Sequence, residues 1–138
     1  MKLRILQIKE AAGEFANSPD AIAQLMKEEA KADRECFWVL HMNTKNQIIE
    51  KELVAMGVLD AAYIHPREVF RKAVINSSYC IATVHNHPSG FTEPSEADKK
   101  VWNMLKESGK ILQIEVVDNL VISPSGRFYS QKRDGTSI

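Results

Sequence analysis

A short apolar run that ends directly in a pair of histidines constrains this chain more than any other feature of its sequence. The run covers 79–84, Tyr-Cys-Ile-Ala-Thr-Val, and its apolar, β-branched composition predicts a buried strand. His85 and His87 follow at its carboxyl end. Because residues i and i+2 of a strand point to one face, both imidazoles can reach one ion, whereas Asn86 must point elsewhere.

The loop after the histidines leads into a segment that offers a third ligand. Ser95 ends a loop rich in glycine and proline, and the residues from 96 onward have helical composition. Ser95 is a candidate N-cap, and Asp98 falls in the first helical turn, where its carboxylate can turn toward the loop. Imidazole and carboxylate are common zinc ligands, and three protein ligands with one open position are typical of catalytic sites. The spacing predicts one Zn²⁺ per chain, bound by His85, His87 and Asp98.

Each part of this pattern also has an ordinary structural explanation. A Ser-x-x-Asp sequence before a helix is typical of a capping box, in which Ser95 and Asp98 satisfy free backbone amides. Paired histidines taken alone indicate a surface or core position about as strongly as a metal site. The joint occurrence of strand, histidines, turn, serine and first-turn aspartate favours the metal site.

The complete pattern resembles a known family. Two histidines separated by one residue, then seven residues, a serine, two residues and an aspartate form the motif of the JAB1/MPN/Mov34 metalloproteases, called JAMM. The run His-Asn-His-Pro-Ser-Gly at 85–90 is similar to the RadC-type bacterial branch, and the resemblance extends over roughly 18–129. Further segments that agree with this branch are 37–40, 57–60, 65–70 and 118–122.

The resemblance implies a fold as well as a site. It implies an α/β architecture of the MPN type, a curved mixed β-sheet flanked by helices in a cytidine-deaminase-like sandwich. A chain of 138 residues suits one core, so we expect a single RadC-like MPN/JAMM domain over 1–138. Longer RadC-type proteins carry an N-terminal helix-hairpin-helix-like region, which we do not expect here because few residues precede Ser18.

The resemblance also implies a catalytic glutamate just before the first core strand, and Glu35 holds that position. A metal-activated water needs a nearby group that takes its proton and returns it to the leaving amine. An arbitrary glutamate at such a helix-to-strand junction would be a solvated surface residue. Glu68 is the second candidate, but it follows Pro66 in a predicted first helical turn, where the helix dipole favours a carboxylate without any catalytic role.

Ser95 matches the family's oxyanion-stabilising position, at which a hydroxyl donates a hydrogen bond to the carbonyl oxygen as it becomes negative. Water is the expected nucleophile, because no Ser/His/Asp arrangement indicates another one. His41 and His65 lie outside the motif and are interpreted as structural. The catalytic candidates are therefore Glu35 and Ser95.

Composition limits the class of protein. With 44% apolar and 26% charged residues the chain has an ordinary globular balance. No apolar run approaches the ~20 residues of a membrane helix, and no signal segment begins at Met1, so we expect no membrane contact and a cytoplasmic location. Cys36 and Cys80 are interpreted as buried structural thiols.

Hydrophobic periodicity and turn residues predict alternating strands and helices. The expected helices are 18–32, 66–75 and 96–108, the last ended by Gly109 as a C-cap. The expected strands are 36–42, 48–56, 61–64, 79–84, 111–122 and 127–130, with turns at 43–46 and 124–126.

Two functional hypotheses of different classes follow. The favoured one is a zinc-dependent hydrolase of JAMM type that cleaves a peptide or isopeptide bond in a peptide or protein-conjugate substrate. The alternative, based on the family's association with DNA repair, is an accessory or nucleic-acid-binding domain with a structural or vestigial metal. A formal net charge of zero disfavours it, because DNA binding needs a concentrated positive face. Four lysines in the region of the third predicted helix leave room for a local patch: Lys99, Lys100, Lys106 and Lys110.

A nuclease is a third, less favoured hypothesis. Zinc-activated water also attacks phosphorus, but the sequence offers one metal and no evident phosphate clamp. The identity of the substrate and the oligomeric state are left open by the sequence.

Overall fold

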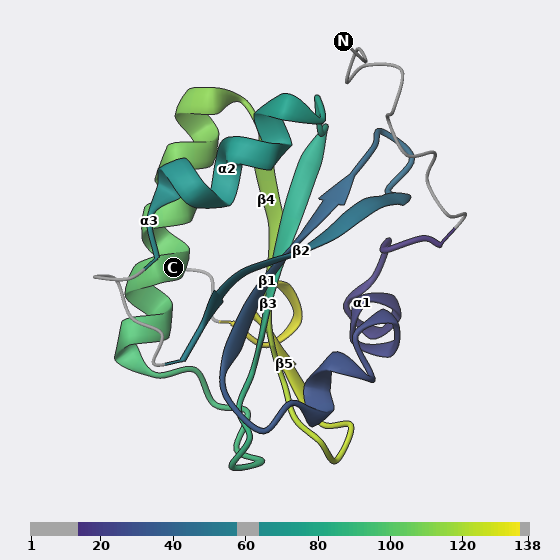
Figure 1. The fold of residues 1–138 in the computed structure, drawn as a ribbon, viewed down its shortest axis with the longest axis vertical. Coiled ribbons are helices and arrows are strands. Elements are labelled where there is room, and N and C mark those ends of the chain that lie inside the picture. Colours follow the sequence, from purple (N-terminus) through teal and green to yellow (C-terminus); the bar gives the residue numbers. More distant parts are fainter. Residues whose placement is uncertain (1–13, 58–63, 136–138) are drawn as a thin grey trace, which may run out of the picture.

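The computed structural model describes residues 14–57 and 64–135, which form a mixed five-stranded β-sheet with helices on both faces (Figure 1). The strands lie in the order β2-β1-β3-β4-β5. Only β3 and β4 are parallel, and the helix between them in sequence packs on one face. The α/β class and the mixed, helix-flanked sheet are therefore confirmed. The strand bounds are β1 Cys36–Met42, β2 Ile48–Met56, β3 Cys80–Asn86, β4 Glu115–Ile122 and β5 Phe128–Ser130.

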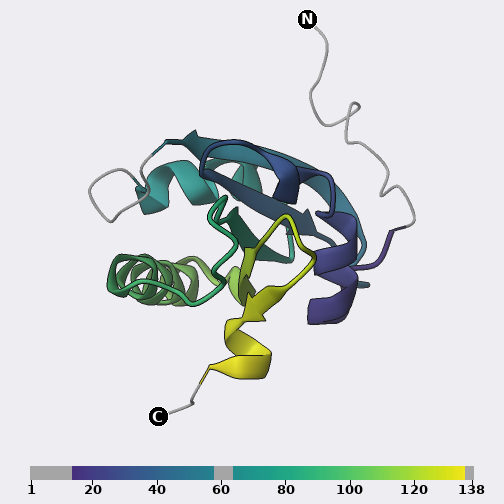
Figure 2. The same ribbon diagram turned by 90° about the horizontal axis from the view of Figure 1, so that it is seen from below.

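The helices divide between the two faces of the sheet (Figure 2). One face carries α1 (Pro19–Leu25) and the short 3-10 helix η2 (Glu29–Lys31), and the other carries α2 (Pro66–Ile75) and α3 (Glu96–Leu112). A last short helix, α4 (Gln131–Asp134), follows β5. In the described part of the chain, no helix has the length and apolar character needed to cross a bilayer.

Strand β3 is buried on both faces and separates two cores. Its residues Ala82 and Val84 pack into the core under α1, whereas Ile81 packs into the core under α2 and α3. Because side chains alternate along a strand, His85 continues the face of Ile81, and Asn86 continues the face of Val84. The strand therefore directs these two neighbours to opposite sides of the sheet.

Helix α3 is longer than the sequence predicts. It continues to Leu112, and Gln113, with a left-handed φ of 59°, forms the C-cap. The expectation that Gly109 ends the helix is wrong, because Gly109 is a buried residue of the helix. A Cβ atom there would lie 2.5 Å from the backbone oxygen of Ile114. The glycine permits a close approach of chain segments, and the strand expected from 111 begins at Glu115.

Other element bounds also differ from the predictions. The helix expected through 32 ends at Leu25 and is followed by η2. Helix α4 was not predicted, because four residues carry no helical periodicity. Its N-cap is Ser130, whose Oγ accepts the backbone N–H of Arg133 and donates to Asp118 at 2.6 Å. Most of the strand expected at 61–64 lies outside the described residues, and Ile64 is not in a strand.

Candidate metal centre

The three predicted ligands converge at the carboxyl end of β3. His85 is in β3, His87 follows the strand directly, and Asp98 lies in the first turn of α3. The two Nε2 atoms are 3.2 Å apart, and each lies 3.3 Å from Oδ2 of Asp98. The three donor atoms thus form a nearly equilateral triangle, and they belong to one cluster with metal-binding spacing.

The size of this triangle fits a tetrahedral metal ion. Metal–ligand bonds of about 2.0–2.1 Å place neighbouring corners of a tetrahedron about 3.3 Å apart. The measured separations of 3.2, 3.3 and 3.3 Å correspond to three such corners. Among residues 14–57 and 64–135 the cluster has three members, which would leave the fourth corner of a tetrahedron for water or a substrate atom.

The loop after β3 fixes the orientation of the His87 ring. Its Nδ1 atom donates to the backbone oxygen of Phe91 at 2.8 Å, which leaves the lone pair of Nε2 for a metal. The loop closes through a hydrogen bond from Gly90 N to the His87 carbonyl at 3.0 Å. Gly90 has a φ of +94°, which suits glycine. This backbone conformation allows the chain to turn directly after His87.

Aromatic side chains hold the His85 ring. Phe37 stacks near it with ring centroids 6.3 Å apart, and Trp102 lies at 6.1 Å on α3. Only 2% of His85 is exposed. This apolar enclosure limits the ring to one orientation and strengthens the electrostatic interactions of the cluster, because water is excluded. The sequence alone gave no role to either aromatic residue.

The capping box that the sequence offered as an alternative to the metal site is present together with it. Ser95 Oγ accepts the Asp98 N–H at 3.0 Å, and Asp98 Oδ2 accepts the Ser95 N–H at 2.8 Å. The cap orients the Asp98 carboxylate toward the histidines. Burial alone would raise the pKa of Asp98, but hydrogen bonds with His85 and His87 outweigh burial and hold that pKa far below its usual range.

The charge distribution also acts on His87. Its hydrogen bond with Asp98 raises the pKa of His87 above the ordinary value, although burial opposes this effect. The Phe91 carbonyl and the negative charge of Glu35 raise it further. The charge of Glu35 therefore acts on His87.

The pairing of β1 with β3 explains why Glu35 lies close to the histidines. Glu35 directly precedes β1, and Phe37, two residues later, pairs with His85 of β3. Glu35 is partly buried, and its carbonyl accepts a hydrogen bond from Gly57 N at 2.8 Å. Glu68 instead lies exposed in the first turn of α2, in agreement with a role in helix stabilisation.

The side chain of Ser95 is exposed at the amino end of α3. Its Oγ atom accepts the Asp98 amide, so the hydroxyl hydrogen remains available for donation to a ligand. His41, by contrast, is fully buried in a separate network with Glu52 at 2.9 Å and Ser78 at 3.3 Å. His65 is the N-cap residue of α2. Both histidines lie outside the metal cluster.

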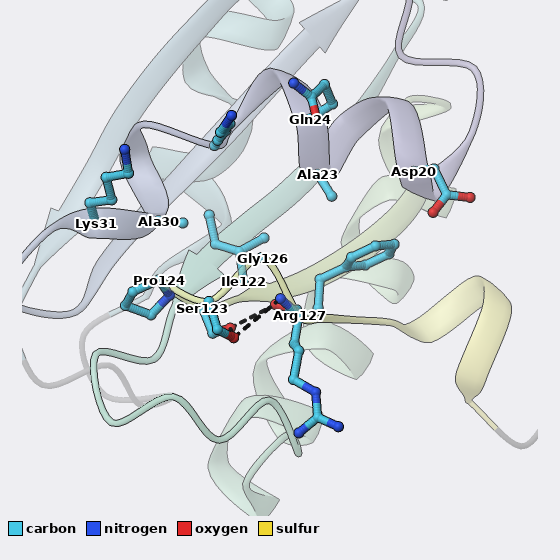
Figure 3. Close-up of a pocket in the computed structure, with 13 residues that line it drawn as sticks. Asp20, Ala23, Gln24, Ala30, Lys31, Ile122, Ser123, Pro124, Gly126 and Arg127 are labelled. Atoms are coloured by element: carbon cyan, nitrogen blue, oxygen red, sulfur yellow. Dashed lines mark hydrogen bonds between the residues drawn. The ribbon is translucent and has the colours of Figure 1, made fainter.

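A cavity of about 350 Å³ lies between α1, η2 and the turn that joins β4 to β5 (Figure 3). Its walls include Lys31 and Arg127, but the Arg127 side chain extends away from α1. The residues that line it include neither the three predicted ligands nor Glu35 and Ser95. This cavity is therefore separate from the metal centre.

The chain is similar to known proteins over most of its length. The family model described as a RadC-like JAB domain matches residues 16–136. A UPF0758 protein of Pelodictyon phaeoclathratiforme is 54% identical over 95 residues, which cover 69% of this chain and 43% of the relative. One from Chlorobium chlorochromatii is 48% identical over 102 residues, or 74% of this chain and 46% of the relative.

A more distant relative covers more of the chain. A UPF0758 protein of Methanosarcina acetivorans is 38% identical over 128 residues, which are 93% of this chain and 56% of the relative. The chain thus spans about half the length of the curated relatives it matches. On the match over 16–136 and these identities, the chain belongs to the RadC-like JAB domain family.

Proposed function

We propose that this chain is a zinc-dependent hydrolase that cleaves a peptide or isopeptide bond by JAMM-type chemistry. The observation that carries the proposal is the triangle of His85 Nε2, His87 Nε2 and Asp98 Oδ2 around one open corner. Membership in the RadC-like JAB domain family supports a metal-dependent hydrolase. Beyond family membership, we propose that the metal is zinc, that the cleaved bond is a peptide or isopeptide bond, and that particular residues have the roles given below.

The donor set favours zinc over harder metals. Two imidazoles and one carboxylate with a tetrahedral spacing are typical of catalytic zinc, whereas magnesium and calcium prefer more oxygen ligands. When bound, zinc acts as a Lewis acid that activates water and polarises a carbonyl group. His85, His87 and Asp98 would hold it.

Two further residues complete the proposed chemistry. The Glu35 carboxylate takes the proton of the attacking water and returns it to the leaving amine. The Ser95 hydroxyl donates to the carbonyl oxygen as negative charge develops on it. Water is the nucleophile, so an amide bond in a peptide or in a protein conjugate is broken without a covalent enzyme intermediate.

The surface of α3 gives no support to the nucleic-acid-binding alternative. Lys99 pairs with Glu96 at 3.5 Å, and Lys110 pairs with Glu107 at 3.5 Å. Lys99 and Lys110 are therefore each paired with an acidic residue of the same helix, which argues against a concentrated positive charge at these two positions.

The proposal is tested with the purified chain after chelation and reconstitution. One portion receives Zn²⁺ and another Mg²⁺, and each is incubated with a peptide library and with lysine-linked isopeptides whose products are identified by mass spectrometry. We expect one Zn²⁺ per chain and new amine termini only with zinc. An Asp98→Asn variant, which keeps side-chain size, is the control and should release no product. Products that form equally in chelated protein would contradict the proposal, as would a failure to bind zinc.

A further inference from the structure

We propose that Asn86, which lies between the two histidine ligands, is a positioning residue that fixes Glu35 at the metal centre. The inference rests on the proposed function, because it takes Glu35 as the acid/base group. It concerns a residue to which sequence reasoning gave no role beyond pointing away from the metal.

The side chain of Asn86 is fully buried on the α1 face of the sheet. Its Oδ1 atom accepts the backbone N–H of Cys36 at 2.7 Å. Its Nδ2 group donates to the carbonyl of Arg34 at 2.9 Å and to that of Ala32 at 3.3 Å. One amide thus binds the backbone on both sides of Glu35.

Only a primary amide can make this set of contacts at this position. Its oxygen accepts while its NH₂ group offers two hydrogens, so one side chain satisfies one backbone donor and two backbone acceptors. An aspartate keeps the contact to Cys36 N but turns a carboxylate toward the Arg34 carbonyl, which repels it. An alanine removes all three contacts.

The position of Asn86 on β3 connects the clamp to the metal. Its neighbours His85 and His87 contribute two corners of the metal triangle from the other face of the sheet. The segment that carries Glu35 is therefore tied to the same stretch of backbone that holds the ligands. A displacement of about 1 Å in a reacting group can lower a rate by roughly 10²-fold. Loss of the clamp should therefore affect catalysis more than metal binding.

The matched control is Asn119. It is a buried asparagine of the neighbouring strand β4, and its side chain donates to Gln131 at 2.8 Å. Neither its register partner Thr83 nor Gln131 belongs to the Glu35 segment. Asn119→Ala therefore removes a buried amide of equal size without touching the clamp.

Hydrogen exchange of the Cys36 amide, followed by NMR in the metal-free chain, tests the clamp without any activity measurement. We expect faster exchange of this amide in Asn86→Ala and unchanged exchange in Asn119→Ala. Asn86→Asp retains an oxygen that accepts the Cys36 N–H, so this amide should stay protected from exchange. This variant replaces Asn86→Ala in the comparison if Asn86→Ala folds poorly. Equal Cys36 exchange in wild type and Asn86→Ala would overturn the clamp.

A double-mutant cycle tests the link to catalysis. Zinc content should be unchanged in Asn86→Ala and Asn86→Asp, whereas kcat should fall by about 10²-fold with little change in KM. In a Glu35→Gln background, Asn86→Ala should cause no further loss, because it acts through Glu35. Additive losses, or a normal kcat with zinc retained, would overturn the positioning role. Failure of the wild-type chain to cleave any amide probe would instead refute the proposed function. The hydrogen-exchange result would still show whether Asn86 holds the Cys36 amide.

Discussion

Ser95 and Asp98 exchange two hydrogen bonds, one from each backbone N–H to the other residue's side chain, at 3.0 and 2.8 Å. The same Oδ2 atom of Asp98 faces both metal-site histidines. The cap of α3 thus holds both the predicted metal ligand Asp98 and the candidate oxyanion donor Ser95 in position. Stability and chemistry are therefore coupled at the amino end of α3.

Replacing any one of the three ligands should remove the metal. We expect about one zinc per wild-type chain and a sharp loss in His85→Ala, His87→Ala and Asp98→Ala, because two remaining ligands bind too weakly to compete. Elemental analysis after gel filtration measures the content. His65→Ala is the control, since His65 lies outside the cluster and should keep its zinc. Stoichiometric zinc in all three ligand variants would refute the site.

Glu35→Gln should separate the acid/base group from the ligands. The variant should fold normally and retain zinc, but it should lose at least ~10²-fold in hydrolysis, the usual contribution of a positioned proton-transfer group. The acidic limb of its pH–rate profile should disappear. If the variant loses its metal or keeps near-normal turnover, Glu35 is misassigned and Glu68 is the next residue to test.

Ser95→Ala should lower both rate and stability for different reasons. Loss of the oxyanion donor should reduce kcat by ~10²–10³-fold across the pH profile, and loss of the N-cap should cost about 1 kcal/mol of unfolding free energy. Ser18→Ala is the matched control, because Ser18 caps α1 through the Ala21 amide at 3.1 Å, away from the metal cluster. It should lose stability and keep its rate. An equal rate loss in both variants would show that capping alone is responsible.

The metal-free chain should become less stable as pH rises above neutrality. The hydrogen bond with Asp98 raises the pKa of His87 above the ordinary value of 6.5. A group with a raised folded-state pKa stabilises the fold fully below its unfolded pKa, and that contribution is lost as pH rises through the folded value. We expect Tm to fall as pH rises above about 6.5 and through the raised folded pKa of His87.

The His87→Ala variant should lack this decline, and zinc should restore Tm most strongly at the higher pH, where protons no longer compete for the imidazole. The stabilising contribution of Asp98 depends on pH in the opposite direction. Because its pKa is lowered, its stabilisation is present above its unfolded value of 3.8 and is lost only as pH falls through the folded value. A wild-type Tm that is flat from pH 6 to pH 9 without metal would contradict the assigned interaction.

Gly109→Ala should destabilise the chain, although the same change in most helices stabilises by about 1 kcal/mol. The new Cβ would lie 2.5 Å from the Ile114 carbonyl oxygen, so the backbone after α3 must shift. We expect a loss of about 1–3 kcal/mol in urea unfolding, the usual cost of overpacking. Lys106→Ala, at an exposed position of the same helix, should be neutral. A stabilised Gly109→Ala variant would show that α3 can move without cost.

Much of the site was predictable because its determinants are local. Alternation along β3 sends His85 and Asn86 to opposite faces, and the three-residue spacing of Ser95 and Asp98 defines the cap. Both follow from periodicities that can be read over a few residues. The resemblance then supplied Glu35, which no local pattern distinguishes from a surface glutamate.

Tertiary structure decided what depends on distant contacts. Asn86 reaches Cys36 across 50 residues of sequence, and no spacing rule could pair them. Gly109 reads locally as a helix end, but it lies inside α3, where the closeness of the Ile114 backbone oxygen leaves no room for a side chain. The sequence by itself determined which side chains share a strand face or a helical turn, because backbone geometry sets those relationships. The packing of the sheet against its helices determined which segments meet, because those contacts exist only once the chain is folded.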